Sequence, residues 1–515
     1  MMAVHKVVVT NVSGLKAKYG PEYARLRTSL AKLVRADLKR GLRTRVVALD
    51  SPAVMKRLGG KPVSSVNDQQ GAKEAVDAIY GHYQPDYILI LGAPDIVPHI
   101  DLANPLQGTP DDDGDIVVPS DVPYACAAGW SRQPQDFVGP SRVVGRLPDL
   151  AGADEPSYLQ KLIDTAARHR PMPRKDYARH FAISAKVWIR STAESMDNLF
   201  GPGAIVLTAP PKGPRWPRRA LAPRIHFINC HGDTCSPKFF GEHPTNRFVD
   251  AHDAVHLPTR ISKGAVVAAE CCYGAELYEP AKAQGQAGIA NTYLGEGAIG
   301  FLGSTTIAWG PSEGQGQADL ICQYFIEAVR KGASLGRAAL EARQRFVAQF
   351  THTDPADLKT AVQFLLLGDP SVHPVDPTPH AFARSKTVRR APKGLIHSET
   401  RTFRRERLIR TGTNLTRTLG AAVPSKDAIP KPVRRFLIKA AEESGMLNPT
   451  FKSYRVTFPS AQRRPRGMHT SRRPKRLIFA ALGSLGTSTR GARISAIIAT
   501  VEGDKIVHVR RVHSR

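Results

Sequence analysis

Short apolar runs of strand length alternate with amphipathic helix patterns from the start of the chain to about residue 377, and this alternation constrains the fold more than any other feature. A strand, a helix and a second strand in this order form a right-handed crossover, which places the two strands parallel in one sheet. Helices then cover both faces of that sheet. In the first part of the chain the pattern predicts strands at residues 6–10, 44–49, 86–91, 116–119 and 142–147, with helices at 21–39 and 72–82.

After a predicted helix at residues 156–167 the alternation starts again and predicts a second parallel sheet. Its strands are expected at 180–185, 204–208, 225–229, 264–269, 298–303 and 363–367, with helices at 288–294, 316–330 and 335–349. The sequence that follows, GDPSVHPVDPTP, is rich in proline and polar residues, as is typical of a stiff linker after a domain. The α/β part of the chain is therefore predicted to end near residue 378.

The positive charge of the chain lies almost entirely beyond this point. The 515 residues carry a formal net charge of +28, and residues 381–515 hold 31 Lys and Arg against 7 Asp and Glu, or +24. A long cationic segment attracts polyanions such as nucleic acid or an anionic membrane surface, although a basic solvated face explains the charge equally well. The densest patch, RRPRGMHTSRRPKR, has almost no aromatic residues, which favours contact with phosphates over base stacking.

Pattern and composition together predict four units. They are an N-terminal α/β subdomain at residues 1–170, a second α/β subdomain at 171–378, a basic linker region at 379–450 and a small basic β-rich domain at 451–515. In the last unit, apolar runs on both sides of a Glu-Gly-Asp turn predict a β-hairpin at 493–501 and 505–512.

The start of the chain, MMAVHKVVVTNVSG, lacks the pattern of a signal peptide, and no window approaches about 18 uninterrupted apolar residues. We therefore expect a cytoplasmic protein with no membrane span. Six cysteines are few for this length, so reduced thiols are a better explanation than a disulfide framework.

Two of the predicted strands end in side chains that can do chemistry. The strand at 225–229 is followed by CHGD, with His231 and Gly232, and the strand at 264–269 by ECCYG, with Cys271. Reactive groups of open parallel sheets lie just beyond the carboxyl ends of the strands, so these residues are expected side by side. A histidine activates a cysteine as a thiolate nucleophile, and a glycine lets its backbone N–H approach a reacting carbonyl oxygen. The pattern predicts an acyl-transfer site.

The same segments resemble a known family. FINCHG and VVAAECCYG resemble the His-Gly and Ala-Cys strand ends that caspases, legumains and gingipains share. PDYILILGAPDIVP, PSDVPYACAAG, SRVVGRLP, GAIGFLGSTTIAWGP and LLLGDPSV resemble segments of the gingipain branch, over roughly residues 86–373. The resemblance implies an α/β, caspase-hemoglobinase-like three-layer fold with two parallel-sheet subdomains. It also implies a cysteine endopeptidase that acts on protein or peptide substrates without a cofactor.

The resemblance assigns roles by position. His231 and Cys271 match the catalytic dyad, and the backbone N–H groups of Gly232 and Cys271 match the oxyanion donors. Trp309 matches an aromatic residue of the substrate pocket. Asp197 lies near the position that gives some gingipains their preference for basic residues, and it is a further candidate for substrate binding.

The nucleophile is assigned to Cys271, and not to Cys272, because a tyrosine and a glycine follow it at the expected offset. Two positions depart from the family pattern. Glu270 stands where a small residue is common, and Lys186 stands where an acid is common. A carboxylate beside the thiol raises its pKa, and a missing acid loosens the histidine. These departures favour an alternative, a weak or inactive scaffold whose basic tail binds nucleic acid.

Two metal sites are further alternatives. Thiolate and imidazole are the ligands of tetrahedral zinc, and five such residues lie near one another in the sequence: Cys230, His231, Cys235, Cys271 and Cys272. Calcium prefers oxygen ligands, which an acidic run supplies at Asp111, Asp113 and Asp115. The first lacks paired Cys-x-x-Cys spacing and the second lacks the bidentate Glu of an EF-hand loop, so a buried thiol cluster and a solvated turn are the favoured interpretations.

Overall fold

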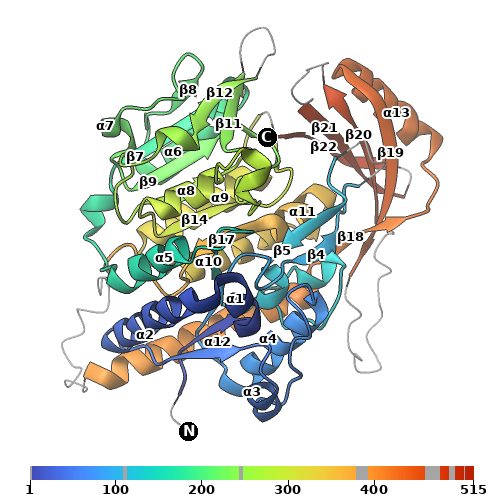
Figure 1. Cartoon of the computed structure of the whole chain (residues 1–515). Coiled ribbons are helices and arrows are strands. Elements are labelled where there is room, and N and C mark those ends of the chain that lie inside the picture. Colours follow the sequence, from blue (N-terminus) through green and yellow to red (C-terminus); the bar gives the residue numbers. More distant parts are fainter. Residues whose placement is uncertain are drawn as a thin grey trace, which may run out of the picture.

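One ten-stranded sheet forms the centre of the protein in the computed structural model, which describes residues 3–107, 113–242, 248–311, 313–377, 393–458, 476–485, 493–503 and 505–515 (Figure 1). From edge to edge its strands are β2 (Thr44–Ala48), β1 (Lys6–Thr10), β3 (Tyr87–Leu91), β6 (Val144–Leu147), β17 (Phe364–Gly368), β14 (Gly300–Ser304), β13 (Val266–Ala269), β9 (Ile225–Asn229), β7 (His180–Ala185) and β8 (Leu207–Ala209).

The sheet has two parallel halves that run in opposite directions. β17 pairs in parallel with β6 on one side and antiparallel with β14 on the other, and all other neighbours are parallel. The two sheets predicted from the sequence are therefore one continuous sheet. The strand that joins them is β17, which pairs with β6 on one side and with β14 on the other, and whose five residues, FLLLG, are all buried.

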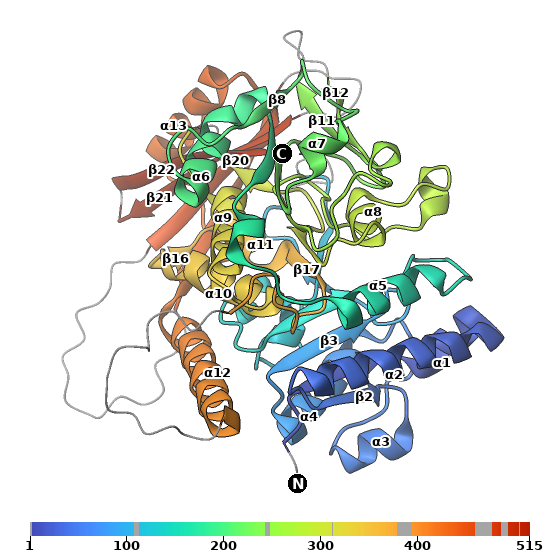
Figure 2. The ribbon, with the colours of Figure 1, turned by 90° about the vertical axis from the view of Figure 1, so that its left-hand side faces the viewer.

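Helices cover both faces of this sheet (Figure 2). α2 (Tyr23–Lys39), α5 (Ser157–Arg168) and α8 (Ile289–Gly295) lie on one face, and α9 (Gln317–Arg330) and α10 (Leu335–Ala348) lie on the other. The buried side chains of α5 are Leu159, Leu162, Ile163, Ala166 and Ala167, a spacing that places them on one side of the helix. The mixed α/β fold with a parallel sheet and flanking helices is thus confirmed.

Smaller elements complete the α/β part. They are α1 (Val12–Tyr19), α3 (Pro52–Arg57), α4 (Gln69–Tyr83), α6 (Ile189–Phe200), α7 (Arg218–Leu221) and α11 (Pro355–Gln363), a two-stranded sheet of β4 (Ile100–Ala103) and β5 (Val117–Ser120), and a three-stranded sheet of β10 (His231–Gly232), β11 (Lys238–Glu242) and β12 (Phe248–Asp253). The strand predicted at 116–119 is β5, which lies outside the central sheet. Its proline has no N–H to donate, which suits an edge strand.

A second sheet, here called the C-terminal sheet, lies beside the α/β part (Figure 1). Its order is β15 (Trp309–Gly310), β22 (Lys505–Ser514), β21 (Arg493–Glu502), β20 (Arg476–Leu485), β19 (Met446–Thr457), β18 (Gly420–Ser425) and β16 (His352–Thr353). α13 (Lys431–Glu443) packs against β19, β20 and β21, while α12 (Lys393–Thr418) packs against α10. The predicted hairpin is confirmed as β21 and β22.

The boundary of the C-terminal unit differs from the prediction. β18 pairs with β19, and α13 covers the same sheet, so the unit begins at Gly420 and not near residue 451. The segment predicted as a basic linker therefore contributes a strand and two helices. Two short strands of the α/β part, β15 and β16, extend the C-terminal sheet at its two edges, which ties the two parts together.

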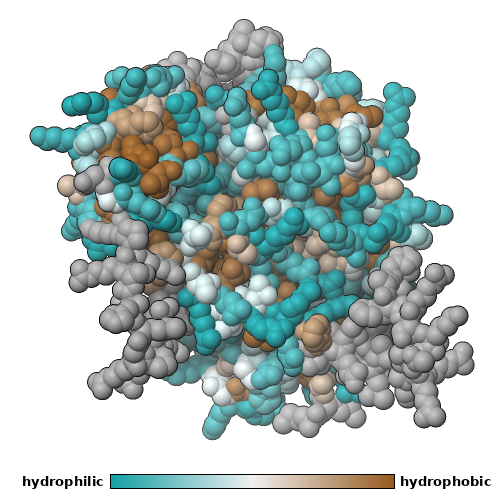
Figure 3. Space-filling model, turned by 180° about the vertical axis from the view of Figure 1, so that it is seen from behind, coloured by the Kyte–Doolittle hydropathy of each residue, from teal (hydrophilic) through white to brown (hydrophobic). Residues whose placement is uncertain are grey.

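Most of the surface is hydrophilic when the molecule is seen from behind, with a large apolar area on the side where the C-terminal sheet lies (Figure 3). Among the described residues, no helix is both long and apolar enough to cross a membrane. The dense basic patch at residues 463–475 lies outside the described residues, so its contact with nucleic acid stays a prediction.

Candidate active site

The carboxyl ends of β9 and β13 bring the predicted motifs together. These strands are parallel neighbours, with Ile228 opposite Ala269, so both end at the same edge of the sheet. Gly232 then packs against the backbone of Cys272 so closely that a Cβ atom at position 232 would overlap with the Cys272 carbonyl oxygen. The histidine segment and the cysteine segment are therefore side by side, as the strand ends predicted, and only glycine fits between them.

His231 is held on three sides. Its Nε2 lies 2.9 Å from Glu242 Oε1, its ring stacks on Phe248 with centroids 4.3 Å apart, and the ring of Trp188 lies 4.5 Å away on centroids. Burial lowers the pKa of His231, and the hydrogen bond with Glu242 partly offsets this effect. Glu242 is thus the carboxylate that orients the ring. Lys186, which stands where an acid is common in the family pattern, is exposed.

The two adjacent cysteines point in different directions. Cys271 is fully buried, and its Sγ lies 3.8 Å from the carbonyl oxygen of Ile228 in β9. Burial raises its pKa well above the ordinary value. The Sγ of Cys272 instead accepts a hydrogen bond from the N–H of Ala308, at 3.3 Å. The chain leaves its extended conformation after β13 (Val266–Ala269) and turns at Cys272 and Tyr273, so the two cysteine side chains point different ways.

This geometry bears on the predicted dyad of His231 and Cys271. Cys271, which the sequence pairs with His231, directs its thiol at the backbone of β9, whereas Cys272 is the cysteine whose backbone meets Gly232. Directly after it, Tyr273 has a φ of 53°, a left-handed conformation that is rare for a side chain of this size. Such strain is concentrated at functional sites.

Two backbone N–H groups converge on one carbonyl oxygen, that of Arg515. The N–H of Gly232 donates to it at 3.4 Å and the N–H of Cys272 at 3.3 Å. A pair of donors aimed at one oxygen is the arrangement of an oxyanion hole. Gly232 was predicted for this role, but the second donor on this oxygen is Cys272 and not Cys271.

The chain leading to Arg515 is an extended strand that runs past Trp309 and Gly310 to the backbone of Gly232 and Cys272. The space that residues 513–515 fill there is called the cleft below. In β22, Ser514 pairs with Trp309 and His513 pairs with Gly310, antiparallel, and the N–H of Arg515 donates to Ala308 O at 3.0 Å. The predicted pocket residue Trp309 is therefore at the cleft, with its backbone along the bound strand and its side chain fully buried.

The side chain of Arg515 fills a deep pocket and is fully buried. Its Nη1 lies 2.6 Å from Glu270 Oε2 and also donates to Asn229 Oδ1, and its Nη2 lies 2.8 Å from Asp319 Oδ2. The guanidinium carbon lies 5.1 Å from the centre of the Trp188 ring. Three acceptors and an aromatic ring thus surround one planar cation.

Burial and the nearby Asp319 raise the pKa of Glu270 well above the usual range, although Arg515 opposes this effect. Two buried carboxylates in one pocket repel each other, and a cation between them relieves this repulsion. The Glu270 that stands as a departure from the family pattern is therefore a pocket residue. Asp197, by contrast, accepts a hydrogen bond from the N–H of Ala204 at 3.0 Å within the turn after α6.

The two metal alternatives gain no support from the described residues. Among the described residues, no three His, Cys, Asp or Glu side chains are placed to hold a metal ion, so the zinc alternative has no ligand cluster there. Asp113 and Asp115 both face the buried ammonium of Lys359, at 2.7 and 2.6 Å. A protein cation thus stands where calcium was considered, and Asp111 lies outside the described residues.

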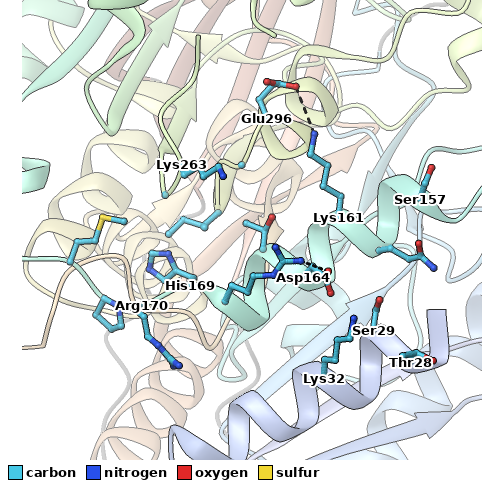
Figure 4. A pocket seen from close by; sticks show the side chains of 18 of the residues that line it. Thr28, Ser29, Lys32, Ser157, Lys161, Asp164, His169, Arg170, Lys263 and Glu296 are labelled. Atoms are coloured by element: carbon cyan, nitrogen blue, oxygen red, sulfur yellow. Dashed lines mark hydrogen bonds and ion pairs between the residues drawn. The ribbon is translucent and has the colours of Figure 1, made fainter. Parts of the chain in front are cut away.

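A cavity of about 940 Å³ lies elsewhere, between α2 and α5 (Figure 4). Lys263 and Gly297 in its wall precede β13 and β14, so it opens at the amino ends of these strands, whereas the cysteines follow the carboxyl ends. Sites of open parallel sheets lie at the carboxyl ends. This basic cavity is separate from the site of His231 and Cys272.

Comparison with known proteins agrees with the geometry. The family model of peptidase family C25 matches residues 231–375, a segment that begins at His231 and contains the adjacent Cys271 and Cys272. A search of curated proteins found no match. The family match confirms the resemblance to gingipains and indicates a cysteine peptidase with protein substrates.

Proposed function

From the membership of residues 231–375 in peptidase family C25, we propose that the protein is a cysteine endopeptidase with Cys272 as nucleophile and His231 as acid–base partner. One observation supports this proposal above all. The N–H groups of Gly232 and Cys272 hold a single carbonyl oxygen at the end of an extended strand. In such a pair, one donor belongs to the residue that carries the attacking sulfur.

The reaction follows from these positions. His231 takes the proton of the Cys272 thiol, and the sulfur attacks the carbonyl carbon of the peptide bond. The N–H groups of Gly232 and Cys272 stabilise the negative oxygen that forms. When the C–N bond breaks, His231 gives the proton to the departing amine and a thioester remains. Water, deprotonated by His231, then attacks the thioester, which releases the acid and restores the thiol.

Glu242 supports His231 in this cycle. Its carboxylate accepts from Nε2, which leaves Nδ1 for the thiol and fixes the ring. Burial raises the pKa of Glu242, but the hydrogen bond and charge of His231 together with Arg493 outweigh burial and hold that pKa below its ordinary value. Glu242 therefore stays ionised and stabilises the imidazolium that forms during each turnover.

Substitution of the two cysteines and the histidine tests the proposal. We expect Cys272→Ala to abolish peptide hydrolysis, His231→Ala to reduce it by about 10²- to 10⁴-fold, and Cys271→Ala to retain it, because the Cys271 thiol points into the core. Each variant is measured on a peptide library in the full chain and again with Arg515→Ala, since Arg515 lies on the oxyanion donors.

Loss of hydrolysis in Cys271→Ala with retention in Cys272→Ala would return the nucleophile to Cys271. Equal turnover in the three variants and their parent, or no hydrolysis by any of them with Arg515→Ala, would reject the peptidase. The inactive scaffold would then be the better description.

A further inference from the structure

β22 lies in the cleft in the way a peptide substrate would. β22 runs antiparallel to β15. Arg515, which follows β22 directly, places its carbonyl oxygen at the two N–H groups of Gly232 and Cys272 and its side chain in the pocket. Each of these three contacts is one that a substrate needs at the residue before the cut. Their coincidence at a single residue of the same chain calls for a functional explanation.

The pocket is shaped for a guanidinium. Glu270 and Asn229 accept from one terminal nitrogen of Arg515 and Asp319 from the other, which suits a planar fork better than the point charge of a lysine. A Cβ atom at Gly310 would overlap with this guanidinium, so the absent side chain of Gly310 gives the space that the cation fills.

We propose that β22 is a built-in pseudosubstrate: Arg515 fills a pocket that selects arginine before the cut, and residues 513–515 keep peptide substrates out of the cleft. This inference rests on the proposed peptidase function. It names a regulatory state of the same site. Substrate enters only when residues 513–515 leave.

Contacts away from the pocket hold β22 in place. Arg510 pairs with Asp357 in α11 at 3.0 Å and with Asp354, the N-cap residue of that helix. β22 pairs with β21 from Lys505 to His513. From β21, Arg493 reaches Glu242 at 3.5 Å, beside the catalytic histidine. The C-terminal sheet is thereby anchored on both sides of the site, so that residues 513–515 compete with substrate from within the same molecule.

Arg515→Ala in the full chain tests the proposal, with Arg511→Ala on the same strand as the matched control. The Arg511 side chain is 49% exposed and lies outside the cleft. Two rates are measured: alkylation of Cys272 by iodoacetamide, followed by mass spectrometry, and hydrolysis of peptides that differ only in Arg, Lys or Leu before the cut. We expect Arg515→Ala to raise both rates about tenfold or more, because an intramolecular strand competes at millimolar effective concentration.

The two rates separate the two proposals. Faster alkylation without hydrolysis means that β22 covers the cleft but the peptidase function is rejected. Hydrolysis that is equal in the wild type, Arg511→Ala and Arg515→Ala supports the peptidase and overturns the pseudosubstrate. No change in either rate overturns the pseudosubstrate as well. Hydrolysis after leucine or lysine as fast as after arginine overturns the assignment of the pocket.

A second measurement compares two added peptides on the same variant, so that a folding defect of the variant affects both equally. The synthetic peptide RVHSR, which has the sequence of residues 511–515, is added to Arg515→Ala. We expect it to restore protection of Cys272 and to inhibit hydrolysis, whereas RVHSA does neither. Equal effects of the two peptides would contradict the role of the Arg515 side chain.

Discussion

The turn after β13 decides which of two adjacent thiols lies beside the bound strand. The side chain of Glu270 contacts the Arg515 side chain and the Cys272 thiol lies at the Arg515 backbone, while the Cys271 thiol points to the backbone of β9. The offset to the following glycine favoured Cys271. A carboxylate at position 270 cannot face an apolar core unpaired, so the sequence places Glu270 on a polar side of the chain. Which thiol shares that side depends on the turn at Tyr273, whose φ of 53° no local pattern encodes.

Other site residues give weaker signals. Asp319 lies in the first turn of α9, where an acid is common for reasons of the helix dipole alone. Glu242 reaches His231 only because β10 and β11 form a hairpin, and the two-residue strand β10 is too short to predict. Their roles depend on pairing between segments, which no local pattern encodes.

The ionisation of Cys272 gives a prediction at the same scale. With β22 in the cleft, burial raises the pKa of the Cys272 thiol to about 12, although hydrogen bonds from the backbone oppose this effect. The thiolate is the form that reacts. We therefore expect alkylation of Cys272 in the wild type to rise with pH beyond about pH 10, and in Arg515→Ala to level off nearer the ordinary thiol pKa of about 8.5.

The measurement is the rate of iodoacetamide labelling against pH, read from the peptide that carries both cysteines, with fragmentation to separate them. Cys271 remains buried in both proteins and serves as an internal control. If the labelling rate of Cys272 changed with pH in the same way in the wild type and in Arg515→Ala, the expectation would be contradicted. Such a result would mean that β22 does not determine the burial of this thiol.

At the scale of elements, local pattern located the long elements and missed the short ones. The hairpin of β21 and β22 could be predicted from two apolar runs around a turn, and the structure has it within two residues. β15 has only two residues, and its partner lies about two hundred residues further along the chain. The pairing of β15 with β22, on which the pseudosubstrate proposal depends, therefore cannot be predicted from local sequence patterns.

Gly310 in β15 provides a test of that pairing. In Gly310→Ala the new Cβ would overlap with the guanidinium of Arg515, so the pocket no longer accepts arginine at full depth. We expect faster alkylation of Cys272 in the full chain, since β22 is displaced. We also expect slower cleavage after arginine when the substitution is combined with Arg515→Ala, since substrate meets the same obstacle.

The matched control is Gly129→Ala, because a Cβ at Gly129 meets no other heavy atom within 4 Å. It should leave both rates unchanged. If Gly310→Ala behaved like this control in both measurements, the path of the Arg515 side chain past Gly310 would be wrong.

At the scale of the whole molecule, the sequence predicted the strands well but not their assembly into one sheet. β17 was expected at residues 363–367 and lies at Phe364–Gly368. What the pattern could not give is that this strand pairs with both halves, because buried strands have the same apolar composition whether a sheet continues or stops beside them. Sheet order is a property of long-range pairing.

Lys359 connects the stability of the whole fold to the site. Its ammonium is fully buried between Asp113 and Asp115. Asp115 also accepts from Tyr273 Oη at 2.8 Å and from the N–H of Ile307 at 2.9 Å, two residues in the loops beside Cys272. Removal of the cation leaves two buried carboxylates facing each other, so Lys359→Met should lower the free energy of unfolding by about 3–5 kcal/mol.

The measurement is the midpoint of denaturant unfolding, with peptide hydrolysis in the Arg515→Ala background as a second readout. Lys331→Met is the control, because Lys331 is 68% exposed and its pair with Glu327 lies at the surface, where such pairs contribute little. Since Asp115 anchors both loops, Lys359→Met should also reduce hydrolysis under conditions where the protein remains folded. If Lys359→Met unfolded at the same denaturant concentration as Lys331→Met, the buried pair would not be the link between fold and site that its contacts indicate.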